Sequence, residues 1–168
     1  MRVAVTGTPG TGKTTATDRL DTDLEVVHLN DVVESEGLYT AVDEARDSKV
    51  ADLEGVREWL DGREDVLVES HLAHLLEADR VVVLRCAPDE LERRLRDRGE
   101  PARKAEENAE SEALDVILSE AVRVHGEANV YEVDTTELTP GEVADAVSAV
   151  LAGDRDPSAG DVDFTDYL

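Results

Sequence analysis

The chain has 168 residues, enough for one domain with a buried core, and it contains no apolar run long enough to span a membrane. Its 41 acidic residues against 17 basic ones give a formal net charge of −24, and only Lys13, Lys49 and Lys104 are lysines. Because the acids are spread between apolar segments, the composition favours a folded protein adapted to molar salt over the alternative, a disordered or self-repelling acidic chain.

The first predicted strand, residues 3–6, has no targeting signal before it, so we expect a cytoplasmic protein without a membrane contact. It runs directly into Gly7-Thr8-Pro9-Gly10-Thr11-Gly12-Lys13-Thr14, which matches G-x-x-x-x-G-K-[ST]. The glycines let backbone N–H groups face phosphate oxygens, and a predicted helix at residues 13–20 adds its positive end. Lys13 is expected to reach the β- and γ-phosphates, and Thr14 to hold Mg²⁺. The alternative is a glycine-rich turn without a ligand, but strand, loop and helix follow in the required order.

Along the rest of the chain, apolar runs that suit buried parallel strands alternate with helical patterns, which indicates an α/β fold. Strands are predicted at residues 3–6, 25–29, 66–69, 80–85 and 130–133. Helices are predicted at residues 13–20, 30–37, 53–61, 89–98, 104–125 and 140–152. Thr139 is a predicted N-cap, and Gly126 and Gly153 are predicted helix ends. Cys86, the single cysteine, is expected to be a small buried thiol rather than a nucleophile.

The third predicted strand ends in Glu69-Ser70-His71. A carboxylate at the end of a strand beside the P-loop strand is where a Walker B residue orients Mg²⁺ or its water shell, and the alternative is a polar strand end. His71 either lines the phosphate site or caps a helix, and the residues alone leave both open.

Positive charge gathers in one part of this acidic chain, at Arg85, Arg93, Arg94, Arg96, Arg98, Arg103 and Lys104. Arginines that close over a phosphoryl group stabilise its charge and exclude water, so the cluster predicts contact with anions. The alternative is a helix face that is paired with neighbouring acids.

With these motifs, the chain resembles the adenylate kinase isoenzyme 6 family, whose eukaryotic members include CINAP, and most of all its archaeal members. The resemblance is carried by residues 7–15, 30–31, 38–39, 43–44, 68–76, 83–85, 92–99 and 108–113. It implies a P-loop nucleoside monophosphate kinase fold, with a five-stranded parallel sheet flanked by helices. One domain would cover residues 1–153, with a monophosphate-binding insertion at about 28–51 and a short LID at about 98–108, followed by a tail at 154–168. Two of the five aromatic residues lie in that tail, which argues against a purely solvated one.

The resemblance also implies where the substrates bind. ATP would contact Gly10, Gly12, Lys13, Thr14, Thr15 and Arg98, with Mg²⁺ held by Thr14 and Glu69, directly or through water. Lys13, Glu69 and Arg98 would be the catalytic residues, and the acceptor AMP would enter beside Asp31. Many relatives carry an arginine three residues after that aspartate, where this chain has Glu34. Either Arg46 or another arginine replaces it, or monophosphate binding is weak and ATP hydrolysis dominates.

Three functions are therefore compatible with the sequence. The first, which we expect, is transfer of a phosphoryl group from Mg-ATP to AMP or a related monophosphate, with some ATPase activity. The second, implied by the resemblance, is a ribosome-assembly ATPase in small-subunit rRNA maturation, with a small-subunit ribosomal protein and pre-ribosomal RNA as partners. The third is a different small P-loop kinase, of the shikimate or gluconate type, for which no acceptor-binding groups are identifiable in the sequence.

Overall fold

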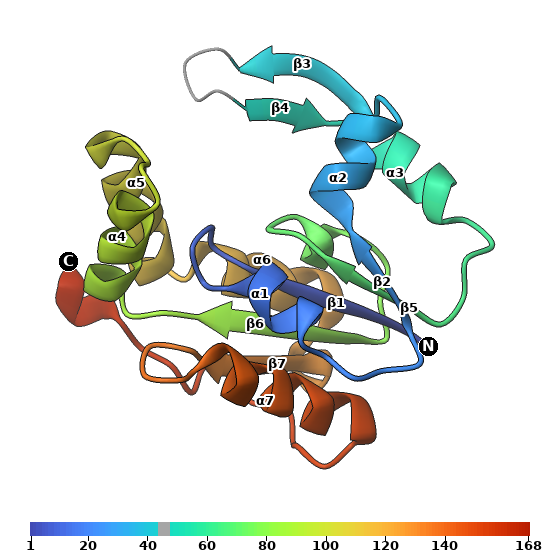
Figure 1. The fold of residues 1–168 in the computed structure, drawn as a ribbon. Helices are drawn as coiled ribbons and strands as arrows, with labels where there is room; N and C mark the ends of the chain where they lie inside the picture. The colour runs from blue at the N-terminus through green and yellow to red at the C-terminus, as the bar shows by residue number, and fades with distance from the viewer. Residues whose placement is uncertain (44–47) are drawn as a thin grey trace.

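A five-stranded parallel sheet forms the centre of the protein, which we describe from a computed structural model for residues 1–43 and 48–168 (Figure 1). In the order β2-β5-β1-β6-β7, its strands are β2 (Glu25–His28), β5 (Val66–Glu69), β1 (Arg2–Gly7), β6 (Arg80–Arg85) and β7 (Val130–Asp134). The predicted fold is confirmed, and each strand ends within one residue of its predicted bounds. Because β1 pairs with β5 and Val5 lies opposite Glu69, the loop after β1 leaves the sheet beside the Glu69 carboxylate.

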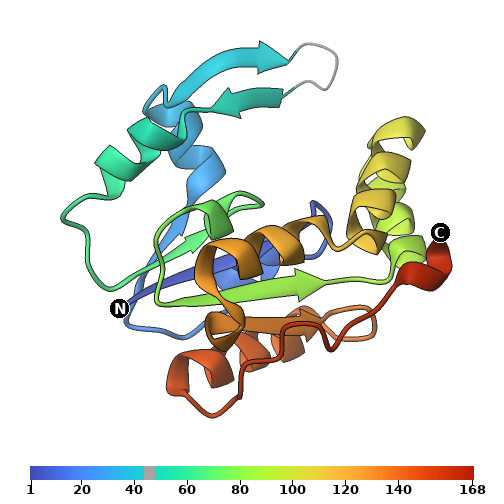
Figure 2. The same cartoon turned by 180° about the vertical axis from the view of Figure 1, so that it is seen from behind.

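Helices cover both faces of the sheet. They are α1 (Lys13–Asp18), α2 (Leu29–Ser35), α3 (Leu53–Leu60), α4 (Pro88–Asp97), α5 (Ala102–Ala113), α6 (Val116–His125) and α7 (Pro140–Ala152), with 3-10 turns η1 (Ala73–Leu75), η2 (Glu127–Asn129) and η3 (Thr165–Tyr167). Successive strand residues point to opposite faces. Val3 and Val5 accordingly belong to an apolar cluster with α1 and α7, whereas Ala4 belongs to one with α2, α3 and α6, the helix nearest the viewer in Figure 2.

An antiparallel hairpin of β3 (Tyr39–Asp43) and β4 (Ser48–Ala51) stands beyond the sheet, beside α2 and α3, as Figure 1 shows. The sequence analysis missed it because residues 39–42 are all exposed, so the segment has no buried apolar alternation to reveal a strand. The hairpin lies across from α4 and α5 in both views (Figures 1 and 2). Arg46 lies outside the described residues.

The long helix predicted at residues 104–125 is wrong, because the structure contains two helices, α5 and α6, with a break at Leu114 and Asp115. Asp115 adopts a left-handed backbone conformation with φ of 55°, and its carboxylate accepts a hydrogen bond from Arg85. Aspartate tolerates this conformation better than most residues. The break between the two helices therefore coincides with a hydrogen bond from Arg85 on β6, and the residues near position 115 carry no local signal for it.

The carboxyl end of α6 and both ends of α7 were predicted correctly. The Thr139 hydroxyl accepts a hydrogen bond from the Glu142 amide at 3.2 Å, and the Glu142 carboxylate accepts one from the Thr139 amide at 3.0 Å, which completes a capping box. Gly126 follows α6, and Gly153 ends α7 with φ of 76°. Among the described residues, no helix has both the length and the apolar character that a membrane span requires.

Residues 154–168 return along the edge strand β7. The amides of Gly160 and Asp161 donate to Oε1 of Glu132 at 2.6 and 3.0 Å, and the Phe164 ring lies 5.3 Å from the Arg85 guanidinium. This guanidinium, expected to meet an anionic ligand, is instead 1% exposed. It donates to three carboxylates of the protein itself, at 3.1 Å to Glu112, 2.5 Å to Asp115 and 2.7 Å to Glu132. Arg85 is therefore a structural residue of the core.

Candidate active site

The loop between β1 and α1 forms the floor of a cavity of about 560 Å³. Its glycines have positive φ, 150° at Gly7, 95° at Gly10 and 90° at Gly12. A Cβ at Gly7 would lie 2.6 Å from the backbone oxygen of Leu84, so only glycine permits the loop to pass this close to β6. Gly10, Gly12, Thr14 and Thr15 all line the cavity, as the sequence analysis expected for a phosphate site.

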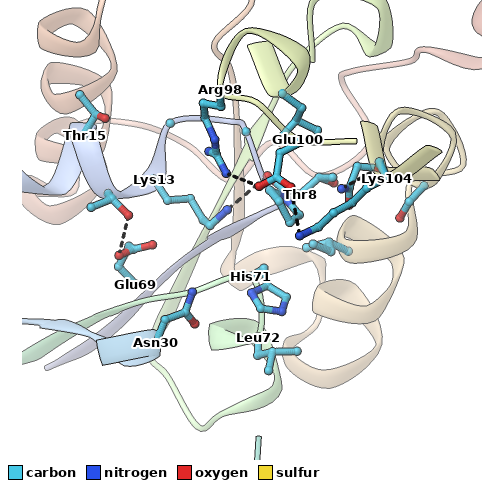
Figure 3. A pocket seen from close by; sticks show the side chains of 18 of the residues that line it. Thr8, Lys13, Thr15, Asn30, Glu69, His71, Leu72, Arg98, Glu100 and Lys104 are labelled. Carbon is cyan, nitrogen blue, oxygen red and sulfur yellow. Dashed lines mark hydrogen bonds and ion pairs between the residues drawn. The ribbon is translucent and has the colours of Figure 1, made fainter. Parts of the chain in front are cut away.

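The ammonium group of Lys13 lies inside this loop. Its Nζ donates to the carbonyl oxygens of Gly7 at 2.8 Å and Thr8 at 3.2 Å, and the side chain points into the cavity (Figure 3). Burial lowers the pKa of Lys13 to about 8, with the charge of Arg98 acting in the same direction and that of Glu69 opposing it. Phosphate oxygens would supply the negative charge that this partly desolvated ammonium lacks.

Thr14 and Glu69 form a pair of oxygen ligands suited to Mg²⁺. The Thr14 hydroxyl donates to Oε2 of Glu69 at 3.2 Å, and both residues line the cavity. A hydroxyl has one hydrogen and two lone pairs, so this donation leaves the lone pairs of Thr14 for a cation. Carboxylate and hydroxyl oxygens, completed by water and phosphate, are the donors that Mg²⁺ prefers. The residues present therefore fit the ion that the sequence analysis placed here.

His28, at the end of β2, contacts the same carboxylate and was missed by the sequence analysis. Its Nδ1 lies 2.7 Å from Oε2 of Glu69, and its Nε2 lies 3.0 Å from Oδ1 of Asp18 on α1. Burial opposes the charged form, but the hydrogen bond and charge of Glu69, together with Asp18, raise the pKa of His28 above its usual value. The only sequence signal was its position at the end of a strand adjacent to the one that carries Glu69.

Two further cavities share lining residues with the central one. A cavity of about 650 Å³ extends toward the loop at residues 135–139 and shares Gly10, Gly12, Thr15 and Arg98. A cavity of about 380 Å³ extends toward the hairpin and shares Asn30, His71 and Leu72. The central cavity therefore adjoins both of the others.

His71 lies where the central and hairpin-side cavities meet, so of its two expected roles the structure favours lining the phosphate site (Figure 3). Burial lowers the pKa of His71 to about 4, and the nearby charges of Lys13 and His74 act in the same direction. The imidazole is therefore neutral at pH 7. His74 is a buried structural residue, bound to the Thr6 hydroxyl and to Glu120, each at 2.7 Å.

Of the arginine cluster, Arg98 is the member that faces both the central cavity and the one beyond the P-loop. Its side chain is 58% exposed and pairs loosely with Glu100 at 3.6 Å, while Lys104, which also lines the central cavity, lies 3.2 Å from the same carboxylate (Figure 3). The other members pair with neighbouring acids: Arg93 with Glu90 and Asp97, Arg94 with Glu90, Arg96 with Glu92 and Glu106, and Arg103 with Glu107. The helix-face interpretation therefore describes these arginines.

Asp31, expected beside the acceptor, is exposed in the first turn of α2 and lines none of the three cavities. Its neighbours Asn30 and Glu34 do line the hairpin-side cavity. Lys49 on β4 lines it as well, with Nζ 3.5 Å from Oε1 of Glu34. The sequence analysis missed this role of Lys49, although a lysine in so lysine-poor a chain was a signal.

Comparison with known proteins gives concordant findings. The family described as AAA domain matches residues 3–115. A protein named "Putative adenylate kinase" from Halobacterium salinarum is 66% identical over 169 residues, and one of the same name from Natronomonas pharaonis is 63% identical over 168 residues, with 100% of both chains covered in each case. A solved shikimate kinase from Bacteroides thetaiotaomicron has a TM-score of 0.61 at 18% identity, covering 90% of this chain and 98% of that one, which supports the P-loop kinase fold alone.

Proposed function

The chain belongs to the AAA-domain family and to the group of archaeal proteins named as adenylate kinases, and from this premise we propose that it is a nucleoside monophosphate kinase. It would transfer the γ-phosphoryl group of ATP to AMP or a related monophosphate, reversibly, with slow hydrolysis of ATP as a side reaction. The observation that carries the proposal is the row of three adjoining cavities that share lining residues, with Lys13 and the Thr14–Glu69 pair at the middle one.

ATP would place its β- and γ-phosphates on the P-loop and its nucleoside in the cavity at residues 135–139. Thr14 and Glu69 would hold Mg²⁺, which supplies charge neutralisation at the phosphates. Lys13 binds the same oxygens from within the loop, and Arg98 can move from Glu100 onto the γ-phosphoryl group. Pre-positioned charges of this kind stabilise the transition state at little reorganisation cost.

His71, at the junction with Asn30 and Leu72, suits an acceptor that needs no general base from this imidazole. A sugar or shikimate hydroxyl must lose a proton during transfer, and His71, with a pKa of about 4, is a poor base at pH 7. A phosphate monoester has a second pKa of about 6 and already presents an anionic oxygen. That oxygen forms the new bond to the γ-phosphorus while the bond from this phosphorus to the bridging oxygen of ADP breaks.

The hairpin-side cavity would hold the acceptor. Leu29, Val33 and Ala51 give it apolar walls for a nucleoside, and Lys49 is the cation among its described lining residues. Lys49 would thus supply the charge that relatives place at the position of Glu34. Asp31, which lies outside the cavity, would have no direct contact with the acceptor.

The test is a coupled assay of ADP formation in molar KCl, with ATP and a panel of AMP, GMP, CMP, UMP and shikimate. We expect AMP or another monophosphate to accelerate ADP formation well above hydrolysis, with the diphosphate of the acceptor as second product. No transfer to any monophosphate at millimolar concentration would overturn the proposal. The ribosome-assembly ATPase would then be the function to test, through stimulation of hydrolysis by a small-subunit ribosomal protein.

A further inference from the structure

We propose that His28 is a positioning residue of the phosphoryl-transfer site, which fixes the Glu69 carboxylate in the orientation needed at Mg²⁺. The inference rests on the proposed use of Mg-ATP and concerns a residue that does not line the three cavities described above. His28 would act through Glu69 and would not touch substrate.

The strand register brings the two residues together. β2 pairs with β5 in parallel, and His28 lies opposite Glu69 at the carboxyl ends of both strands. From there the imidazole reaches Oε2 of Glu69 with Nδ1 at 2.7 Å and Oδ1 of Asp18 with Nε2 at 3.0 Å. Asp18 lies one helical turn after Thr14 on α1. The ring thus connects the strand and the helix that carry the two predicted metal-binding oxygens.

The contacts of His28 and Thr14 with Glu69 leave the second carboxylate oxygen of Glu69 available to the site. His28 and Thr14 each bond to Oε2, and among the described residues no hydrogen bond to Oε1 occurs. Glu69 is only 5% exposed, yet it lines the central cavity, so Oε1 is the oxygen available there. Without His28, the carboxylate would be free to rotate away from the orientation in which Oε1 serves the cavity, and its contact with the Thr14 hydroxyl would weaken. Partners of metal-binding groups commonly change metal affinity or activity about 10- to 100-fold when removed.

A purely structural role for His28, tying the edge strand β2 to α1, is the competing explanation. Two amide substitutions separate them because each amide nitrogen overlaps one ring nitrogen. His28→Asn places its amide where Nδ1 donates to Glu69, whereas His28→Gln reaches toward Asp18. His28→Phe removes both contacts, and Asp18→Asn weakens only the outer contact at a carboxylate that is 60% exposed.

The experiment measures ADP binding by calorimetry with Mg²⁺ and with EDTA, together with kcat, KM for ATP and the melting temperature without ligand. For His28→Gln and His28→Phe we expect the gain in ADP affinity from Mg²⁺, and kcat, to fall about 10-fold or more. KM for ATP should rise with the lost Mg²⁺-dependent affinity, whereas ADP affinity in EDTA and the melting temperature should stay close to the wild type. His28→Asn and Asp18→Asn should retain most of the wild-type values.

Equal losses in the Asn and Gln variants, or a wild-type response to Mg²⁺ in folded His28→Gln, would overturn the inference. Should His28→Phe fail to fold, the Asn and Gln variants still decide the matter. A wild-type protein that binds ADP equally with Mg²⁺ and with EDTA would instead count against the proposed function itself, so the two failures are distinguishable.

Discussion

Replacement of Arg98 by alanine is the most direct test of the proposed transfer mechanism. Arg98 lies just after α4, is 58% exposed and pairs with Glu100 at 3.6 Å. An exposed pair of this kind contributes only ~0–1 kcal/mol, so the side chain can leave Glu100 cheaply and its removal should hardly destabilise the fold. Its effect on catalysis should be far larger, because an arginine on a transferring phosphoryl group commonly accounts for about 10³-fold or more in kcat.

Arg96 provides a matched control on the same helix. It is also exposed, but it is held by Glu92 at 2.6 Å and by Glu106 at 3.2 Å, and it lines none of the three cavities. We expect Arg96→Ala to keep nearly full activity. Arg98→Ala should lose about 10³-fold in kcat for ADP formation from ATP and AMP, which corresponds to ~4 kcal/mol of transition-state stabilisation.

The assay is the coupled measurement at saturating ATP and AMP in molar KCl, with nucleotide affinity measured separately by calorimetry. If Arg98→Ala retains more than about a tenth of wild-type kcat, the arginine does not act on the phosphoryl group in flight. An equal loss in Arg96→Ala would show that both changes act through the helix rather than through the site. A loss confined to KM for ATP would assign Arg98 to binding alone.

Three further predictions concern Lys13, Lys49 and the net charge of the chain. Lys13→Ala should lower turnover by ~10²-fold or more while the melting temperature changes little, and retention of a tenth of the activity would contradict its placement on the phosphates. Lys49→Ala should raise KM for AMP about tenfold, as expected for one charge-assisted hydrogen bond, with KM for ATP unchanged; equal effects on both would remove Lys49 from the acceptor cavity. The melting temperature, followed by circular dichroism, should fall when KCl is diluted from molar to ~0.1 M. The Debye length then grows from ~3 to ~10 Å, so the acidic residues of this chain, with its net charge of −24, repel one another more strongly in the folded state. A constant melting temperature would reject the salt adaptation.

Those parts of the fold whose signal is local could be predicted from the sequence. The centre of the sheet was predicted well because β5, β1 and β6 are short, largely apolar runs buried on both faces. The P-loop was predicted because the spacing of its glycines, lysine and threonine is specific to this structure. The hairpin of β3 and β4 could not be predicted, since residues 39–42 of its first strand are exposed. His28 and Lys49 reach the site because their strands pair with neighbouring strands, and the hydrophobic periodicity of a sequence does not predict which strands pair.

The wrong interpretation of Arg85 shows why a charge pattern alone cannot identify an anion site. The arginine at the end of a central strand does meet anions, but they are Glu112, Asp115 and Glu132 of the same chain. Removing one partner of such a buried pair typically costs ~3–5 kcal/mol, because the remaining charge is left desolvated. Sequence order gave no indication that α5, α6 and β7 would bring three carboxylates to one guanidinium.

This buried cluster also explains how the site can combine fixed and movable groups. Glu112 accepts hydrogen bonds from Arg85 at 3.1 Å and from the Thr8 hydroxyl of the P-loop at 3.3 Å, so the loop is tied to the core beneath it. Lys13 is likewise held by the carbonyl oxygen of Gly7 at 2.8 Å, and Glu69 by Nδ1 of His28 at 2.7 Å. Arg98, on the exposed end of α4, has no comparable restraint among the described residues. In the proposed reaction, the fixed groups would lower the reorganisation cost of transfer, while an arginine that arrives late would exclude water from the γ-phosphate. Whether the phosphoryl group passes to a monophosphate or to water would then depend on how completely Arg98 and the acceptor close the central cavity together.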